Sequence, residues 1–300
     1  MILIALTIGF TLNNMYDDAY ITFFLMFGYI FLVLLKRENM IEEEENTATN
    51  SFSTKANISK TAYHVYYGDE LNFSDDELTR ILTKRFPYFI PLSPIQKTEF
   101  LKRLQNFIAD KTFKIHEGKG FKEMPVLISA AAIQLSFGLK KYLLPHFEFI
   151  HIYPQEFLRV RPVLCFLKGN VSRHAINLSW KHFMEGYLNP ADGQNVGLHE
   201  LAHALYYQMF EVGNNADKGF RDLYDEYIID ADKAYRTEKT TAEGLYSEYA
   251  ERNSQEFWAE SVEIFFEKPV EMRSYYPQLY DRMKFLLNQD PVNNNPSMIR

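Results

Sequence analysis

Two histidines and a glutamate in the segment 193–210 have the types and spacing needed for metal chemistry. His199, Glu200 and His203 read His-Glu-x-x-His. On an α-helix the two histidines lie one turn apart on one side and can share a metal ion. Two neutral imidazoles suit Zn²⁺, and Glu200 could take a proton from a zinc-bound water without itself being a ligand. The pattern is typical of zinc-dependent peptidases.

The apolar residues around this motif predict that it is helical. They recur at i, i+3, i+4, i+7 and i+11, which is the buried stripe of an amphipathic helix: Leu198, Leu201, Ala202, Leu205 and Met209. Asp192 or Asn195 could cap the start of the helix. The alternative is a chance spacing of two core or surface histidines, and we favour the metal interpretation.

A third ligand is expected downstream of the motif. A catalytic zinc takes three protein ligands, whereas a structural zinc is usually closed by four Cys or His residues. The only cysteine, Cys165, lies in the apolar run 163–167, remote from the motif, and is predicted to be a buried small hydrophobe. The segment 249–269 carries a stripe of carboxylates that is by itself typical of a solvated helix face: Glu256, Glu260, Glu263 and Glu267. Spacing alone leaves Glu256 and Glu260, one turn apart, as alternative ligands.

Two sequence runs carry a resemblance to a known family. DGQNVGLHELAHAL at 192–205, followed by YAERNSQEFWAE at 249–260, resembles the zinc peptidases of the Mlc titration factor A (MtfA) family. The Tyr-x-x-x-Asn-x-x-Glu-Phe pattern also resembles the catalytic domain of the lethal factor toxin. The likeness extends over roughly 85–291 and includes 153–157 and 177–180.

The resemblance implies a role for each matched residue. His199, His203 and Glu256 would bind one Zn²⁺ per chain, and Glu200 would activate the water. Tyr249 would help to stabilise the oxyanion formed during hydrolysis.

Two further matches would support the ligands rather than bind the ion, and one family feature is missing. Glu260 would orient a ligand histidine by a hydrogen bond, and Asn253 would support the same region. The family commonly has Gln-Leu-Asp after the second histidine, where this chain has Ala-Leu-Tyr at 204–206. A supporting carboxylate is therefore absent there.

The resemblance to a peptidase also implies a peptide or protein substrate. An extended substrate is expected along an edge strand at 175–180, with Asn177, Ser179 and Trp180 as candidate substrate-binding residues. The alternative function is a regulatory module that captures a transcriptional repressor or another protein partner with little or no turnover. An intact Glu200 favours the enzyme, because a scaffold needs the histidines but not the base.

The amino-terminal part of the chain predicts a membrane anchor. The run 19–35 contains 17 residues without a charge, and Lys36 and Arg37 follow it directly. Residues 1–37 would form one span or a helical hairpin, with a buried core helix as the alternative. The flanking positive charges favour a cytoplasmic location for the catalytic domain. The acidic, Ser/Thr/Asn-rich stretch 38–61 is predicted to be a solvated tether.

The remaining pattern predicts an α+β, zincin-like domain. Helices are expected to begin near Ser74 and Ser93, giving a helical amino-terminal lobe at 62–118, with a third helix at 124–142. Strands are expected at 147–153, 163–167 and 175–180. The catalytic domain would cover 119–290, and a flexible tail 291–300. The net charge of −7 and the absence of a basic patch argue against nucleic acid as a partner.

Overall fold

The computed structural model describes residues 63–116, 120–159, 164–210, 218–238, 244–247, 250 and 253–293. These residues belong to one compact unit, Ala62–Arg300. The predicted anchor at 1–37, the predicted tether at 38–61 and most of the predicted tail lie outside the described residues. In the part of the chain that is described, no helix has both the length and the apolar character needed to cross a membrane.

The first two predicted helices are present, and each begins with a capping box. Ser74 caps α3 (Asp75–Arg85) together with Glu77, and Ser93 caps α4 (Pro94–Ala109) together with Gln96. In each case the serine oxygen accepts from a backbone N–H in the first turn, while the acidic or amide side chain accepts from the serine N–H. Short 3-10 turns precede the two helices, at Gly68–Glu70 and Pro87–Phe89.

The domain contains a five-stranded sheet, and its strand order is β1-β2-β3-β7-β6. Its strands are β1 (Tyr63–Tyr67), β2 (Thr112–His116), β3 (Phe149–Tyr153), β7 (Ala175–Ser179) and β6 (Gly169–Ser172). The three central strands are parallel, and both outer strands are antiparallel to their neighbours. Isoleucines 150, 152 and 176 are fully buried on one face, as alternation in a half-covered sheet requires.

The sheet corrects two of the sequence predictions. Residues 62–118 do not form a separate helical lobe, because β1 pairs with β2, and β2 pairs with β3 in the same sheet as β7 and β6. The predicted edge strand is also wrong: β7 lies between β3 and β6, so β6 is the edge. Sequence pattern identifies strands, but pairing order is a long-range property.

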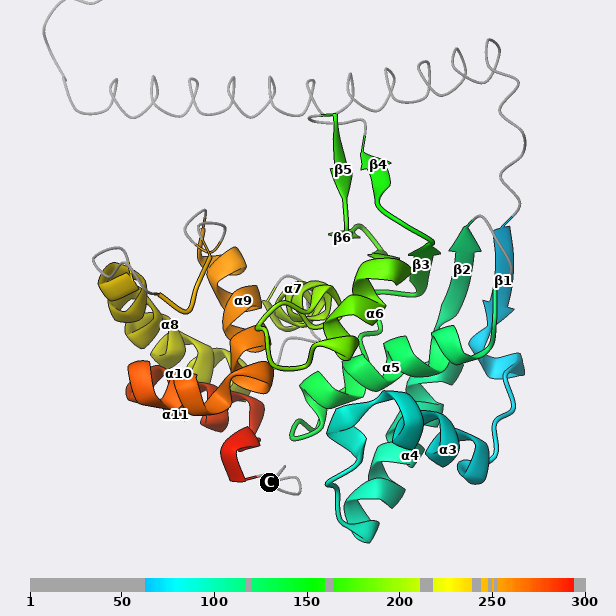
Figure 1. Cartoon of the computed structure of the whole chain (residues 1–300), viewed down its shortest axis with the longest axis horizontal. Coiled ribbons are helices and arrows are strands. Elements are labelled where there is room, and N and C mark those ends of the chain that lie inside the picture. The colour runs from blue at the N-terminus through cyan, green and yellow to red at the C-terminus, as the bar shows by residue number, and fades with distance from the viewer. Residues whose placement is uncertain are drawn as a thin grey trace, which may run out of the picture. The chain divides into compact units, whose positions relative to one another are not determined.

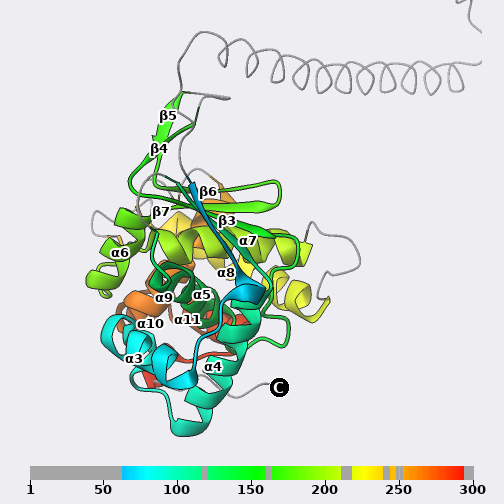
Figure 2. The same ribbon diagram turned by 90° about the vertical axis from the view of Figure 1, so that its right-hand side faces the viewer.

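The helices lie together on one side of the sheet (Figures 1 and 2). The central one, α5 (Glu123–Ser136), is buried from Met124 onward and ends earlier than the predicted 142, at a point where Asn288 donates to the carbonyl of Gly138. The others are α6 (Trp180–Leu188), α7 (Val196–Phe210), α8 (Lys218–Glu238), α9 (Ser254–Glu267), α10 (Pro269–Tyr275) and α11 (Pro277–Leu287), with a final 3-10 turn at Pro291–Asn293.

The part of the chain between β3 and β6 forms a separate two-stranded hairpin that extends away from the sheet. It consists of β4 (Phe157–Arg159) and β5 (Cys165–Leu167), which pair antiparallel. Figures 1 and 2 both show it projecting beyond the rest of the domain. Cys165, predicted to be buried, is half-buried in β5.

Candidate metal centre

Helix α7 carries the two histidines and is held at its start by Asn195. The Asn195 side-chain oxygen accepts from the Leu198 N–H at 3.0 Å, and Asn195 is only 1% exposed. Asn195 is therefore the cap, rather than Asp192. The predicted apolar stripe is buried, and this leaves His199 and His203 partly exposed at its flank.

Helix α9 brings Glu256 against these histidines. The Asn253 side chain caps α9 by accepting from the N–H groups of Gln255 and Glu256, at 2.9 and 3.0 Å. Trp258 is fully buried, and its indole N–H donates to the Ala202 carbonyl of α7 at 3.0 Å. This bond joins α9 to α7. Because Glu256 lies in the first turn of α9, the contact also holds Glu256 close to the histidines.

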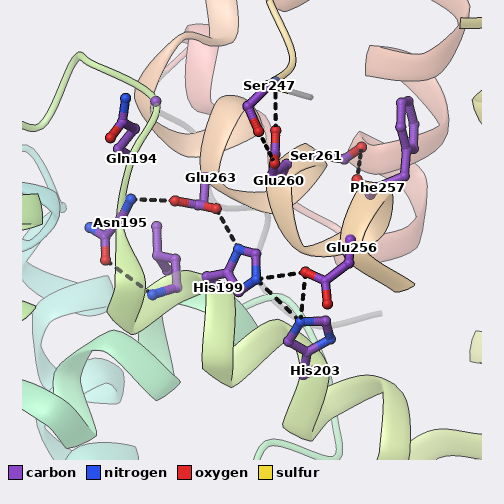
Figure 3. A network of polar contacts seen from close by, with 12 residues as sticks. Gln194, Asn195, His199, His203, Ser247, Glu256, Phe257, Glu260, Ser261 and Glu263 are labelled. Atoms are coloured by element: carbon purple, nitrogen blue, oxygen red, sulfur yellow. Dashed lines mark hydrogen bonds and ion pairs between the residues drawn. The ribbon is translucent and has the colours of Figure 1, made fainter. Parts of the chain in front are cut away.

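Three donor atoms converge where the two helices meet (Figure 3). The carboxylate Oε2 of Glu256 lies 3.2 Å from His199 Nε2 and 3.5 Å from His203 Nε2. All three possible ligand atoms lie within 4.8 Å of one another. Two imidazoles and one carboxylate are the donor set of a catalytic zinc site with three protein ligands, so these residues fit a zinc ion.

Burial and the neighbouring carboxylates shift the pKa values of the candidate ligand residues in opposite directions. Burial alone raises the pKa of Glu256, but hydrogen bonds from His199 and His203 outweigh it and lower that pKa to about 2. Burial lowers the pKa of His199, yet the carboxylates of Glu256 and Glu263 reverse the effect and raise it well above its usual value. The Glu256 carboxylate is therefore ionised, and it places a negative charge beside the Nε2 atoms of both imidazoles.

Glu263 is a site residue that the sequence predictions did not single out. Its Oε1 accepts from His199 Nδ1 at 2.7 Å, and its Oε2 accepts from the Asn195 N–H. A proton held on Nδ1 leaves the Nε2 lone pair of His199 directed at the ion position. The sequence did contain a signal for this role, because Glu263 follows Glu256 by seven residues, which is about two helical turns and places both on nearly the same side of the helix.

Glu260 does not have the predicted role. It accepts hydrogen bonds from the backbone N–H of Ser247, at 2.9 Å, and from the Ser247 hydroxyl, rather than from a ligand histidine (Figure 3). Glu263 follows Glu256 by seven residues, so it lies within about 20° of Glu256 around the helix axis. Glu260 follows by four residues and is rotated from Glu256 by about 40° in the other direction. Glu263 therefore faces α7, and Glu260 faces the segment 244–247.

The carboxylate stripe is buried, which overturns its interpretation as a solvated face. Glu260, Glu263 and Glu267 are 9%, 6% and 9% exposed. Glu267 continues the network by accepting from the Asn195 side-chain amide at 2.9 Å and from the Gly193 N–H at 3.0 Å. Burial is the main reason that the pKa of Glu267 is raised to about 7. The stripe supplies acceptors for the polar start of α7.

Glu200 lies beneath the edge strand β6. A Cβ atom at Gly169 would lie 2.5 Å from Glu200 Cγ and 2.7 Å from its Oε1, so only glycine allows this approach. Burial raises the pKa of Glu200 to about 7, helped by the charges of Glu256 and Glu263 and opposed by His199. A carboxyl with such a pKa can both accept and return a proton near neutral pH.

A comparison with protein families identifies the group to which this site belongs. The model of the glucose-regulated metallo-peptidases, M90, matches residues 70–286. This chain belongs to that family. The predicted MtfA-type identity is thereby confirmed, and the matched region includes the candidate ligand residues on α7 and α9.

A relative of this M90 family member comes from Synechocystis sp. and bears the name Uncharacterized protein slr2042. It is 26% identical over 238 residues, which cover 71% of this chain and 84% of the relative. The similarity extends over most of both chains. The name of this relative states no activity, so the comparison adds none to the family assignment.

Four other predicted site residues of the M90 domain have different outcomes. Asn177 donates to the Ser172 hydroxyl at 3.0 Å and so helps to join β7 to β6. Ser179 is fully buried and hydrogen-bonded to His182, so it is not accessible to a substrate. The substrate contacts of Asn177 and of the half-buried Trp180 stay predictions. Tyr249 lies outside the described residues, and its role also stays a prediction.

Replacing Glu263 with glutamine is expected to weaken zinc binding by about 10 to 100-fold, as losses of groups that orient a ligand do. A glutamine offers one acceptor oxygen where Glu263 serves both His199 and Asn195. Competition between the protein and a chromogenic chelator measures the affinity. Glu260→Gln is the matched control, because it removes one charge from the same helix without touching a ligand. Equal losses in the two variants would contradict the assignment.

Proposed function

We propose that this chain is a zinc-dependent peptidase with a zincin-like catalytic domain. The observation that carries the proposal is the convergence of His199, His203 and Glu256 within 4.8 Å, with Glu200 buried beside them under β6. Membership of a metallopeptidase family supports the same reaction class. A structural metal site would need the ligands but not Glu200.

Each group has a defined task in peptide hydrolysis. His199, His203 and Glu256 would hold the ion, and zinc, when bound, would supply a Lewis acid that polarises the scissile carbonyl and makes water more acidic. Glu200 takes the proton from the attacking water and delivers it to the leaving amine. Glu263 keeps the proton of His199 on Nδ1 throughout. Tyr249 is proposed to donate to the developing oxyanion.

The substrate is proposed to bind as an extended strand along β6. Among the described strands β6 pairs only with β7, so its other edge can accept a peptide backbone. A peptide in that position passes beside Glu200, because the backbone of Gly169 lies against the Glu200 side chain. The glycine thus brings the scissile bond and the base together.

Hydrolysis of peptides by the purified full-length chain in detergent tests the function. Cleavage of a mixed peptide library should stop when a chelator removes the metal and return when zinc is restored. Product masses would identify the cleaved bonds. Capture of a protein partner without turnover at any metal supply would contradict the proposal and favour the regulatory module.

We also propose that the run 19–35 anchors the chain, with the catalytic domain on the cytoplasmic side, on the basis of Lys36 and Arg37. Protease added to intact cells should then spare the domain, and protease added to opened cells should digest it. Immunoblotting against the carboxyl terminus measures both. Digestion in intact cells would reverse the orientation.

A further inference from the structure

A cavity of about 180 Å³ lies beside the start of α7. Its lining includes Asn195 and Glu267, but none of the candidate zinc ligands and not Glu200. Prolines 87, 91, 190 and 291 also line it, and they come from three connections: before α4, between α6 and α7, and after α11. Because proline fixes its own backbone angle, these walls are formed in advance. A cavity of about 150 Å³ is enough for benzene, so the space suits a small organic ligand.

Three aromatic rings contribute to the lining, those of Tyr88, Tyr187 and Phe266. The rings of Tyr88 and Phe266 meet edge to face, with centroids 6.1 Å apart. The Tyr88 hydroxyl donates to Gln289 at 2.6 Å, and the Tyr187 hydroxyl donates to Gln134 at 3.4 Å. The protein thus already satisfies the polar ends of both tyrosines. Aromatic rings attract other rings and also ammonium groups.

Glu267 carries the charge that a ligand in this cavity would meet. It is 9% exposed, and its oxygens accept from two neutral donors, the Asn195 side-chain amide and a backbone N–H. Within the described part of the chain it forms no ion pair, and the charges that act on it most are those of Asp192 and Glu263, both negative. A buried carboxylate held by neutral donors and close to other carboxylates is stabilised by a cation.

The lining suits an organic ammonium group rather than a metal ion. A metal ion needs several ligand atoms, and among the described residues one trio of possible ligands lies close enough together, that of His199, His203 and Glu256. The other acidic residue of the cavity, Asp290, already pairs with Lys284 at 2.7 Å. Proline and aromatic walls offer a metal nothing, whereas they pack well against the carbon atoms of an organic cation.

We propose that this cavity is a binding site for a small organic ammonium compound about the size of benzylamine. The ammonium group pairs with Glu267, and the organic group packs against the three rings. Asn195 links this site to the metal centre, because its backbone N–H donates to Glu263, which holds His199 (Figure 3). A bound ammonium keeps the acceptor of the Asn195 side chain ionised and so supports the start of α7. The inference does not depend on the peptidase reaction.

Equilibrium dialysis of the full chain against benzylamine, with the same detergent on both sides, measures this binding. At about pH 8 the amine is protonated, and Glu267 is ionised because burial raises its pKa only to about 7. Benzyl alcohol is the matched neutral ligand, since it has the same ring and nearly the same size. Benzylamine should bind about ten-fold more tightly, because a charged hydrogen-bond partner contributes at least one factor of ten.

Glu267→Gln should abolish the preference for the amine. Glutamine keeps an acceptor for the Asn195 amide but has no charge, so the affinity for benzylamine should fall to that for benzyl alcohol. Glu271→Gln is the matched control, because it removes the same charge four residues later, at an exposed position that does not line the cavity. It should keep the full preference.

Phe266→Leu is a second variant, which leaves the hydrogen bonds of Glu267 in place. It removes an aromatic ring but keeps an apolar side chain. Both ligands should then bind about two- to ten-fold more weakly, and the preference for the amine should be largely kept. Thermal melting of each variant checks that the fold is kept.

Three outcomes would overturn the proposal. The first is equal binding of the two ligands, or no binding, in the unmodified chain. The second is the same loss of preference in Glu271→Gln as in Glu267→Gln. The third is loss of benzylamine binding when a chelator removes the metal, which would place the amine at the metal centre. Dialysis of the zinc-loaded and the metal-free chain involves no hydrolysis, so failure of the peptidase proposal leaves these results unchanged.

Discussion

Glu200→Gln should abolish peptide hydrolysis and leave the zinc content of the protein unchanged. Glutamine has nearly the same shape, so it fits the space beneath Gly169, and Glu200 is not one of the three converging ligand residues. An amide cannot take a proton from water at neutral pH. The loss in kcat should be at least ~10²-fold, the lower end for removal of a general base. Steady-state hydrolysis, together with metal analysis of the same sample, measures both quantities.

Glu260→Gln is the control for this experiment. It also replaces a buried carboxylate near the site, but one that binds Ser247 rather than facing β6. Its kcat should remain close to that of the unmodified chain. Near-normal turnover in Glu200→Gln would mean that another group acts as the base.

Glu256→Ala should strip the zinc from the protein. The two histidines alone supply only two of the three protein ligands of a catalytic zinc, and Glu256 is the carboxylate within 3.2 Å of His199 Nε2. Alanine is a good helix former, and Asn253 still caps α9, so the helix itself should persist. Zinc measured by atomic absorption after dialysis should fall to background in this variant.

Glu260→Ala decides between the two glutamates that spacing left open. It removes the same side chain one turn further along α9 and should retain zinc, although loss of its bonds to Ser247 should lower the melting temperature. Loss of metal from Glu260→Ala and retention by Glu256→Ala would shift the assigned ligand by one helical turn.

The local features of this site were readable from the sequence. The helix carrying His199 and His203 follows from its apolar period, and the capping residues Ser74 and Ser93 mark their helices. These features depend on contacts between residues three or four positions apart, which the sequence displays directly. Family resemblance then selected Glu256, a choice that spacing alone could not make.

The tertiary structure decided everything that depends on which surfaces meet. Packing of Trp258 against α7 turns Glu263 rather than Glu260 towards His199, and it buries a carboxylate stripe that has the periodicity of a solvated face. Strand order placed β6, not β7, at the edge beside Glu200. Residues 169 and 200, or 199 and 263, are far apart in the chain. Their proximity is fixed by the summed burial of many side chains, and no short segment of sequence encodes that sum.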